Sequence, residues 1–277
     1  MEFNSIESGF FYADGGAMFG AIPKTSWIRR YSCDEKNRCL LAMRCGLIKD
    51  GKRNILVDTG VGSFSDDANS FYEFHNLTNM YDALKEYDLE PDDITDVILT
   101  HLHFDHCGFA TYYCKEEDTY KPSFPKANYW VSKTQWESFR NPSELEKPSF
   151  DPNTLLPVLN AGRLRLIDRA CSIANNIQLY LFDGHTNGQL VPVFESKNQT
   201  LIFPGDVIPT LAHLSLEWIS AYDIMPLKSY AAKKRLLEYA IEKNATLIFY
   251  HDTQVASCSV KKVGEYYKAD TISRSVL

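Results

Sequence analysis

The sequence THLHFDHCG, residues 100–108, places three histidines and an aspartate within six consecutive positions. These candidate ligands are His101, His103, Asp105 and His106. The whole chain has only 7 histidines, so three of them in one short stretch need a chemical reason. Imidazole and carboxylate groups suit zinc, manganese or iron(II). Histidines clustered without a metal would be costly to bury, and we therefore interpret this stretch as a metal-binding motif.

The motif begins where a predicted strand ends, and three later predicted strands end in the same way. If these strand ends lie at one edge of a sheet, six or seven ligands converge there. Taken singly, a strand-end histidine is more often a core residue, but the clustered motif gives the later ones a shared role. The predicted strands are 97–100 before His101, 177–183 before His185, 201–205 before Asp206 and 246–250 before His251.

Side-chain direction within the motif bears on how many ions it could hold. In an extended chain, residues 101, 103 and 105 point to one side because side chains alternate. Asp105 and His106 can face a second ion only if the chain turns, and we expect Gly108 to allow that turn.

The remaining pattern predicts many strands interspersed with a few helices. An Asp50-Gly51 turn separates the apolar runs 39–48 and 54–57, which indicates a hairpin. Segment 141–157, rich in Pro, Ser and Asn, indicates a long surface loop within one domain, residues 1–277. This mixture favours a layered α+β domain. Further predictions are helices within 78–89, 133–140 and 227–244, a strand over 128–132 and a hairpin over 189–206.

Composition excludes several classes of protein. The net charge is −7, from 29 basic and 36 acidic residues, with no basic tract, so we expect no nucleic-acid partner. No apolar run reaches the roughly 18 residues of a spanning helix, and the N-terminus does not resemble a signal peptide, so we expect no membrane association. Seven cysteines without a CxxC pair favour reduced thiols and a cytoplasmic location.

The order of the candidate ligands along the chain resembles the metallo-β-lactamase superfamily. The H-x-H-x-D-H motif is followed by His185, Asp206 and His251, as in its dinuclear hydrolases. It is similar in particular to N-acyl-homoserine lactonases and methyl parathion hydrolase-like enzymes. Segments 13–27 and 205–218 also resemble quorum-quenching lactonase-like members. The resemblance runs from Asp58 to His251 and implies a four-layer αββα sandwich, two β-sheets packed face to face with helices outside.

The resemblance also implies how the ligands divide between two divalent ions. Asp206 would bridge the ions, and Asp58 would steady a ligand by hydrogen bonding, or would be an ordinary turn residue. Zinc is the first expectation, with manganese or iron as alternatives. One ion would be held by His101, His103 and His185, and the other by Asp105, His106 and His251.

We predict that a metal-bridging hydroxide attacks an ester or lactone carbonyl. Asp105 would orient this nucleophile and shuttle a proton. Tyr222 would donate a hydrogen bond to the carbonyl oxygen, with a packed surface tyrosine as the equal alternative. We expect His213 to be a solvated loop residue rather than a substrate contact. Cys107 is expected to point into the core rather than bind metal.

Several alternatives share the predicted site. A phosphotriesterase-like enzyme or nuclease would cleave phosphoesters, although the acidic charge disfavours a nuclease. A glyoxalase II-like thioesterase would want a basic cluster, for which Lys261 and Lys262 are a weak indication. A redox di-iron protein of this type typically has glutamate where His103 stands, so the histidine disfavours that class. The last alternative is a non-catalytic protein that keeps its metal ions for structure, which the complete ligand set disfavours. The apolar N-terminal segment, with Phe10, Phe11, Phe19 and Trp27, fits an acyl-chain pocket, a core or a homodimer contact.

Overall fold

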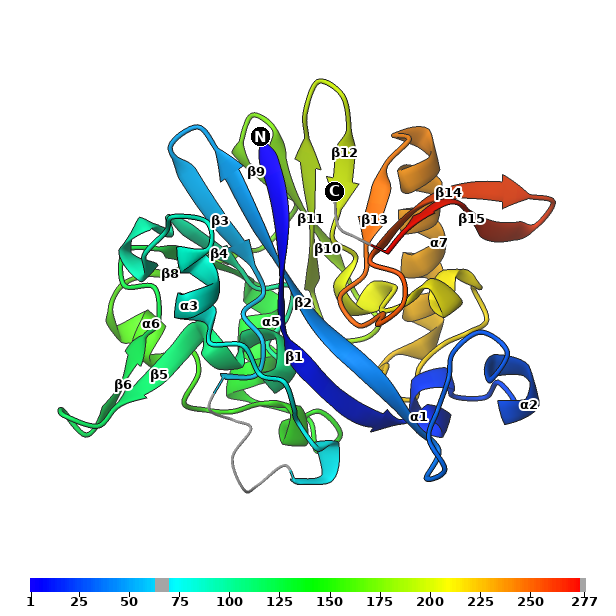
Figure 1. Ribbon diagram of the computed structural model, residues 1–277, viewed down its shortest axis with the longest axis horizontal. Coiled ribbons are helices and arrows are strands. Elements are labelled where there is room, and N and C mark those ends of the chain that lie inside the picture. The colour runs from blue at the N-terminus through cyan, green and yellow to red at the C-terminus, as the bar shows by residue number, and fades with distance from the viewer. Residues whose placement is uncertain (63–69, 275–277) are drawn as a thin grey trace. The chain divides into compact units, whose positions relative to one another are not determined.

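The computed structural model describes residues 1–62 and 70–274 of the chain (Figure 1). Contacts between residues divide the chain into two compact units. The first unit comprises Met1–Phe10 with Met43–Arg169, and the second comprises Phe11–Ala42 with Ala170–Leu277. The single domain over residues 1–277 stays a prediction.

A six-stranded sheet supplies the framework of the first unit, in the order β1-β2-β3-β4-β7-β8. Strands β2 and β3 pair antiparallel, and Gly51 between them has φ 62°, which glycine adopts without strain. The predicted hairpin is therefore confirmed. Strands β3, β4, β7 and β8 run parallel. The strands are β1 (Glu2–Asp14), β2 (Arg38–Asp50), β3 (Arg53–Val57), β4 (Asp96–Ile98), β7 (Asn128–Ser132) and β8 (Leu164–Ile167).

The parallel pairing of β3 with β4 brings two strand ends to the same edge of this sheet. Val57 ends β3 opposite Ile98, which ends β4. Asp58 follows β3, and its N–H donates to the Ile98 carbonyl at 2.9 Å. Strand β4 ends two residues earlier than predicted, although Leu99 N–H still donates to the Trp130 carbonyl. The histidine motif therefore starts close to Asp58.

Side-chain caps fix where two helices of the first unit begin. Asn79 accepts from Tyr81 N–H at 2.9 Å, and Ser132 Oγ accepts from Gln135 N–H at 3.0 Å. The strand over 128–132 and the helix over 133–140 are as predicted, whereas the helix within 78–89 is shorter. The elements are α3 (Met80–Lys85), α4 (Phe104–Cys107), α5 (Lys133–Arg140), α6 (Leu156–Asn160), the strands β5 (Thr111–Cys114) and β6 (Thr119–Pro122), and 3₁₀ turns at Ser70–Tyr72, Pro91–Asp93, Gly108–Ala110 and Lys147–Ser149.

More than half of the residues in segment 141–157 are exposed, as predicted for a surface loop, but four residues anchor the segment in the interior. Glu146, Phe150, Thr154 and Leu155 are each less than a tenth exposed. Burial of the apolar Phe150 and Leu155 side chains stabilises the position of this segment. The Pro, Ser and Asn residues around these anchors concealed them in the sequence.

A seven-stranded sheet forms the framework of the second unit, in the order β15-β14-β13-β12-β11-β10-β9. Only β12 and β13 are parallel; the other neighbours are antiparallel. The pairing of β11 with β12 confirms the predicted hairpin. The strands are β9 (Cys171–Ala174), β10 (Ile177–Phe182), β11 (Gln189–Glu195), β12 (Thr200–Ile202), β13 (Thr246–Ile248), β14 (Ser257–Val263) and β15 (Tyr266–Ser273).

Helix α7 (Pro226–Glu242) packs its apolar stripe in the core of the second unit. Leu236 and Leu237 are at most 1% exposed and share a cluster with Val191 and Phe249. The buried positions of the helix, from Ser229 through Ala232 and Leu236 to Ala240, recur at steps of three and four residues, as the predicted 3.6-residue period requires. Shorter elements of this unit are α1 (Gly15–Phe19), α2 (Lys24–Trp27), and 3₁₀ turns at Gly205–Val207 and Leu211–Leu214.

The N-terminal aromatic residues lie mostly in the protein interior. Phe11, Phe19 and Trp27 are at most 4% exposed. The Phe19 ring stacks on Trp27 with a centroid distance of 4.9 Å and on His213 at 5.1 Å. These contacts favour the core over an acyl-chain pocket for the three buried rings. Within the residues that the structure describes, every helix is too short or too polar to cross a bilayer.

Candidate metal centre

The histidine motif changes conformation halfway along its length. His101 and His103 follow β4 in an extended stretch, but His103 is the N-cap of α4. Its carbonyl accepts from the N–H of His106 at 3.0 Å. Asp105 and His106 therefore lie in a single helical turn, which is the change of direction that a second ion was expected to require. All four side chains are less than a tenth exposed.

Gly108 follows this turn for a different reason from the one expected. Its φ of −59° is ordinary helical backbone, open to any residue. A Cβ at this position would lie 1.9 Å from the Val61 carbonyl oxygen. The glycine is therefore required by the close approach of the chain that follows β3, and not by the direction of the turn.

Asp58 holds two of the motif histidines in one orientation. Its Oδ1 accepts from Thr100 N–H at 2.7 Å, and its Oδ2 accepts from Thr100 Oγ1 at 2.7 Å and His106 Nδ1 at 2.8 Å. The Thr100 hydroxyl donates its one proton to Asp58, so it can only accept from His101 Nδ1, 3.1 Å away. Both rings then carry their proton on Nδ1, which leaves the Nε2 lone pair for a metal ion.

The second unit supplies three further candidate ligands, each just beyond a strand. His185 follows β10, Asp206 lies in the 3₁₀ turn after β12, and His251 follows β13. His185 Nδ1 lies 2.9 Å from Asp223 Oδ1, and His251 Nδ1 lies 2.8 Å from the Ala42 carbonyl oxygen. Both acceptors can only take a proton, so these rings are also protonated at Nδ1.

The carboxylate of Asp206 faces two imidazoles with two different oxygens. Its Oδ2 lies 3.4 Å from His185 Nε2, and its Oδ1 lies 3.3 Å from His251 Nε2. In the first unit, Asp105 Oδ2 lies 3.5 Å from His106 Nε2. Each of these three pairs joins a lone-pair nitrogen to a carboxylate oxygen.

These separations fit a bound cation better than a hydrogen bond. Hydrogen bonds between nitrogen and oxygen span about 2.7–3.2 Å. Two ligand atoms about 2.0–2.2 Å from a tetrahedral zinc ion are roughly 3.4 Å apart. A lone-pair nitrogen facing a carboxylate also needs a positive charge between them. The donor set of imidazoles and carboxylates therefore fits a divalent metal ion.

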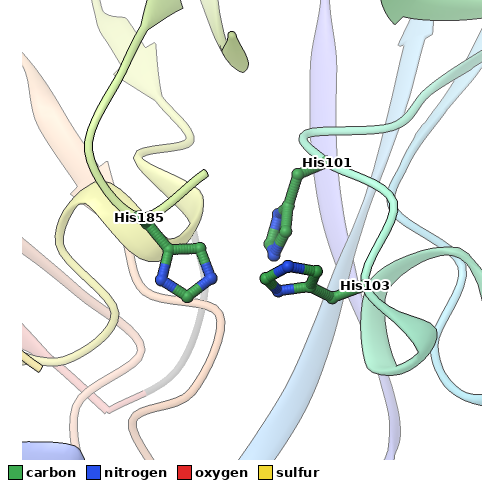
Figure 2. Close-up of side chains that lie close together, drawn as sticks. All are labelled: His101, His103 and His185. Atoms are coloured by element: carbon green, nitrogen blue, oxygen red, sulfur yellow. The ribbon is translucent and has the colours of Figure 1, made fainter. Parts of the chain in front are cut away.

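Three groups of side chains have ligand atoms within 4.8 Å of one another and could hold a metal ion. Figure 2 shows the side chains of one of them, His101, His103 and His185. Together the groups contain all seven predicted metal ligands. Their division between two ions stays a prediction. The groups are His101, His103 and His185; His101, His106 and Asp206; and Asp105, His106 and His251.

The sequence did not reveal several residues that orient these ligands. Thr100 and Asp223 belong to no ligand pattern in the sequence, although Asp223 directly follows Tyr222, a predicted site residue. Ala42 acts through its carbonyl, which no side-chain pattern could indicate. Tyr222 itself has an exposed fraction of 39%, and its catalytic role stays a prediction.

The prediction for His213 is wrong, whereas that for Cys107 is confirmed. His213 is 1% exposed, so the solvated loop histidine is wrong. Its Nδ1 lies 2.7 Å from Thr210 Oγ1 and its Nε2 lies 2.9 Å from the Met18 carbonyl oxygen. Burial and the nearby Lys233 charge lower the pKa of His213 to about 4. Cys107 is confirmed as a core residue, because it is fully buried and burial raises the pKa of its thiol.

Two proteins that resemble this chain in sequence are lactonases. The N-acyl homoserine lactonase AiiA of Bacillus thuringiensis subsp. kurstaki is 26% identical over 237 residues, covering 79% of this chain and 85% of the relative. The N-acyl homoserine lactonase AiiB of Rhizobium rhizogenes is 23% identical over 194 residues, covering 69% of this chain and 68% of the relative.

Solved structures extend the similarity over the whole chain. A probable metal-dependent hydrolase from Staphylococcus aureus has a TM-score of 0.90 and 27% identity, covering 100% of this chain and 98% of that one. AidC, a dizinc quorum-quenching lactonase, has a TM-score of 0.76 at 21% identity, covering 97% and 95%. These similarities confirm the predicted fold class, an α+β fold of the metallo-β-lactamase type.

A family model gives the assignment. The model of the metallo-beta-lactamase superfamily matches residues 44–251, well over half of the 277 residues. The matched region contains all seven candidate ligands. The chain therefore belongs to the metallo-β-lactamase superfamily.

Proposed function

We propose that this chain is a dinuclear metal-dependent hydrolase that opens the ester bond of a lactone. The observation that carries the proposal is the carboxylate of Asp206, whose two oxygens face His185 Nε2 and His251 Nε2 separately. A carboxylate held in this way is suited to bridging two cations. Two divalent ions, most simply zinc, would occupy the groups that contain these residues.

The choice of a lactone rests on the relatives. The sequence relatives named above are N-acyl homoserine lactonases. The matched region of this chain contains every residue proposed to bind metal. An N-acyl homoserine lactone is therefore the first substrate to test.

When bound, two divalent ions would supply a water of lowered pKa and an electrophile for the carbonyl oxygen. The chain's own residues would set the geometry of that reaction. Asp105 Oδ2 lies beside His106 Nε2, where its carboxylate can orient a nucleophile and hold a transferred proton. The Tyr222 hydroxyl would donate a hydrogen bond to the oxygen that gains charge.

Fixed protonation of the imidazoles supports this assignment of roles. Asp58, Asp223 and the Ala42 carbonyl hold the protons of His106, His185 and His251 on Nδ1. The Nε2 atoms would then serve as lone-pair donors to the metal ions and not as general acids. Proton transfer in the reaction would fall to carboxylates, of which Asp105 is the candidate.

The test is hydrolysis of three substrate classes by the purified full chain. A short-chain and a long-chain N-acyl homoserine lactone would be compared with a phosphotriester and a glutathione thioester, each with zinc and with a chelator. We expect zinc-dependent turnover of the lactones above the other classes. Preference for the phosphotriester or the thioester would contradict the lactone assignment. Turnover that survives chelation would contradict the proposal that hydrolysis depends on a metal ion.

A matched pair of variants controls for nonspecific loss. Asp206→Asn removes one carboxylate charge at the proposed bridge. Asp92→Asn makes the same change at an exposed residue paired with Lys126. We expect the first variant to lose at least about 100-fold in kcat/KM and the second to match the wild type. Equal activity of the two variants would contradict the role of Asp206.

A further inference from the structure

Two cysteines lie on either side of a tight turn that the proposed reaction does not use. Cys33 precedes the turn at 34–38, and Cys39 follows it on strand β2. Both are free thiols, and Cys33 is half-buried whereas Cys39 is fully buried. Among the residues that the structure describes, neither cysteine belongs to a group that could hold a metal ion. They are therefore separate from the candidate metal centre.

Backbone hydrogen bonds close the turn between the two cysteines. Asp34 N–H donates to the Arg38 carbonyl at 2.9 Å, and Asn37 N–H donates to the Asp34 carbonyl at 3.1 Å. Asn37 has φ 66°, the left-handed conformation of the last residue in a three-residue hairpin loop. Asp34 and Arg38 thus form the pair that closes the loop. Cys33 and Cys39 are the next residues outward and lie opposite each other.

Side chains reinforce this closure. The Asp34 carboxylate accepts from Arg38 N–H at 2.7 Å with Oδ1 and from Arg38 Nε at 2.8 Å with Oδ2. Asn37 ties the turn to the preceding strand, because its carbonyl accepts from Gly15 N–H at 2.7 Å and its Nδ2 donates to Asp14 Oδ2 at 3.2 Å. Opening of the turn would therefore break several hydrogen bonds at once.

The opposite positions of the two cysteines suit a disulfide. In an antiparallel pair, residues next to a hydrogen-bonded pair have Cα atoms about 4.5 Å apart and side chains on the same face. Disulfides join Cα atoms that are about 4.4–6.8 Å apart. Burial raises the pKa of Cys39 to about 12, and the nearby Cys33 thiol adds to this rise. Such an electrostatic effect requires the two sulfur atoms to lie near each other.

We propose that Cys33 and Cys39 form a site of thiol–disulfide exchange, at which a small disulfide such as oxidised glutathione converts the two thiols into an intramolecular disulfide. The inference is independent of the proposed lactonase activity, because none of its residues takes part in that reaction. It departs from the expected reduced thiols for this pair of cysteines alone. The disulfide would close the turn covalently at the start of β2.

The exchange proceeds in two steps that begin at Cys33, because Cys39 is fully buried. The Cys33 thiolate attacks one sulfur of oxidised glutathione, and one glutathione leaves as a thiolate. Cys39 then gives its proton to solvent, and its sulfur attacks the Cys33 sulfur and releases the second glutathione. Both departing thiolates take up protons from solvent. Two protein thiols are thereby oxidised to one disulfide, and one oxidised glutathione is reduced to two thiols.

Mass spectrometry of the purified full chain tests the bond directly. After incubation with oxidised glutathione and alkylation of the remaining thiols, the denatured protein is digested with trypsin. Trypsin cleaves after Lys36 and Arg38, between the two cysteines, so a disulfide joins peptide 31–36 to peptide 39–44. We expect this joined pair, lighter by two hydrogens than the sum of its peptides. Two separately alkylated peptides, or a joined pair that contains another cysteine instead, would overturn the inference.

A redox titration tests whether the fold holds the two thiols together. The joined peptides are measured across buffers of reduced and oxidised glutathione, for the folded protein and for the chain unfolded in urea. The ratio of squared reduced to oxidised glutathione at half-oxidation should be at least about 10-fold higher for the folded protein, since the turn already brings the thiols together. Equal ratios would mean that the turn does not favour the disulfide.

Variants separate the two cysteines from the rest of the chain. Cys33→Ser should abolish the joined peptides, whereas Cys171→Ser, the same change at another half-buried cysteine, should leave them as in the wild type. Asp34→Ala removes the acceptor of two Arg38 donors and should lower the ratio for the folded protein toward that of the unfolded chain. Asp270→Ala removes an exposed ion pair elsewhere and should not change it.

The outcomes do not depend on the metal centre or on a variant that folds poorly. The digest and the titration both use the wild-type chain. A wild type that forms the disulfide but hydrolyses no lactone contradicts the proposed function alone. A wild type that hydrolyses lactones while both thiols stay reduced in oxidised glutathione overturns the exchange site alone.

Discussion

The carboxylate of Asp58 accepts a hydrogen bond from Nδ1 of His106 at 2.8 Å, and both residues are at most 1% exposed. The same carboxylate accepts two hydrogen bonds from Thr100. Asp58 has φ 56°, a left-handed conformation that is uncommon for a residue with a side chain. The turn after β3 is thus shaped to deliver one carboxylate to the histidine motif.

Asp58→Asn should weaken both metal binding and the fold. An amide offers one acceptor oxygen in place of two, so at least one of the three donors loses its partner. We expect zinc affinity to fall about 10–100-fold, as for other residues that orient metal-binding histidines. The free energy of unfolding of the metal-free protein should fall by about 1–3 kcal/mol, measured by urea titration. Wild-type values for both quantities would refute the assigned role.

Asp223→Ala should affect one ion more than the other. Asp223 orients His185, which belongs to the group with His101 and His103. We expect stepwise removal of zinc by a chelator to show two sites. The zinc affinity of one site should be about 10–100-fold lower than in the wild type, and that of the other site should be nearly unchanged. The exposed Asp270→Ala, which breaks only an ion pair with Lys261, serves as the control. Equal weakening of both classes would argue against separate sites.

His213 should make the protein less stable as the pH falls below neutral. Its pKa is lowered from 6.5 to about 4 in the folded protein, mainly by burial. Between these values the unfolded chain binds more protons than the folded chain, so the free energy of unfolding falls as the pH falls through this window. The loss should be on the order of 3 kcal/mol and complete near pH 4.

Comparison with His213→Asn isolates this contribution. The variant lacks the titrating ring but shares every other titrating group, so these cancel in the difference. Urea titrations of the two metal-free proteins should show the stability advantage of the wild type shrinking from pH 7 to pH 4. An advantage that stays constant across this range would mean that His213 binds a proton equally well in both states.

Tyr222→Phe should slow the reaction without removing metal. Loss of one hydrogen-bond donor to a developing oxyanion costs about 100-fold in kcat at the lower end of known cases. The zinc content should stay at the wild-type level, because the hydroxyl is not among the candidate ligands. An unchanged kcat on the best lactone would assign Tyr222 to the partly exposed surface instead.

The residues with strong local patterns could be predicted from the sequence. The strand over 128–132 and the helix over 133–140 were found because alternation gives way to helical spacing at Ser132, which caps the helix. The seven candidate ligands could be predicted because each is a histidine or aspartate that lies in the motif or directly after a predicted strand. The turn that Asp105 and His106 require comes earlier than Gly108, because α4 begins at Phe104 and the motif itself contains the turn.

The residues that orient the ligands depend on contacts between distant parts of the chain. Asp223 and His185 are 38 positions apart, and Ala42 and His251 are 209 apart, with no pattern that links either pair. The prediction of a solvated His213 is wrong because the Phe19 ring stacks on its ring and Thr210 Oγ1 lies 2.7 Å from its Nδ1. Strand β1 was not predicted, although it runs over 13 residues, because its alternation is broken by small and polar residues.

Anomalous diffraction at the zinc absorption edge, from crystals of the zinc-loaded full chain, tests the central claim most directly. Two peaks about 3.5–4 Å apart are expected, with Asp206 in contact with both. His101, His103 and His185 should contact one peak, and Asp105, His106 and His251 the other. A single peak, or two peaks without Asp206 between them, would contradict a dinuclear centre in this protein.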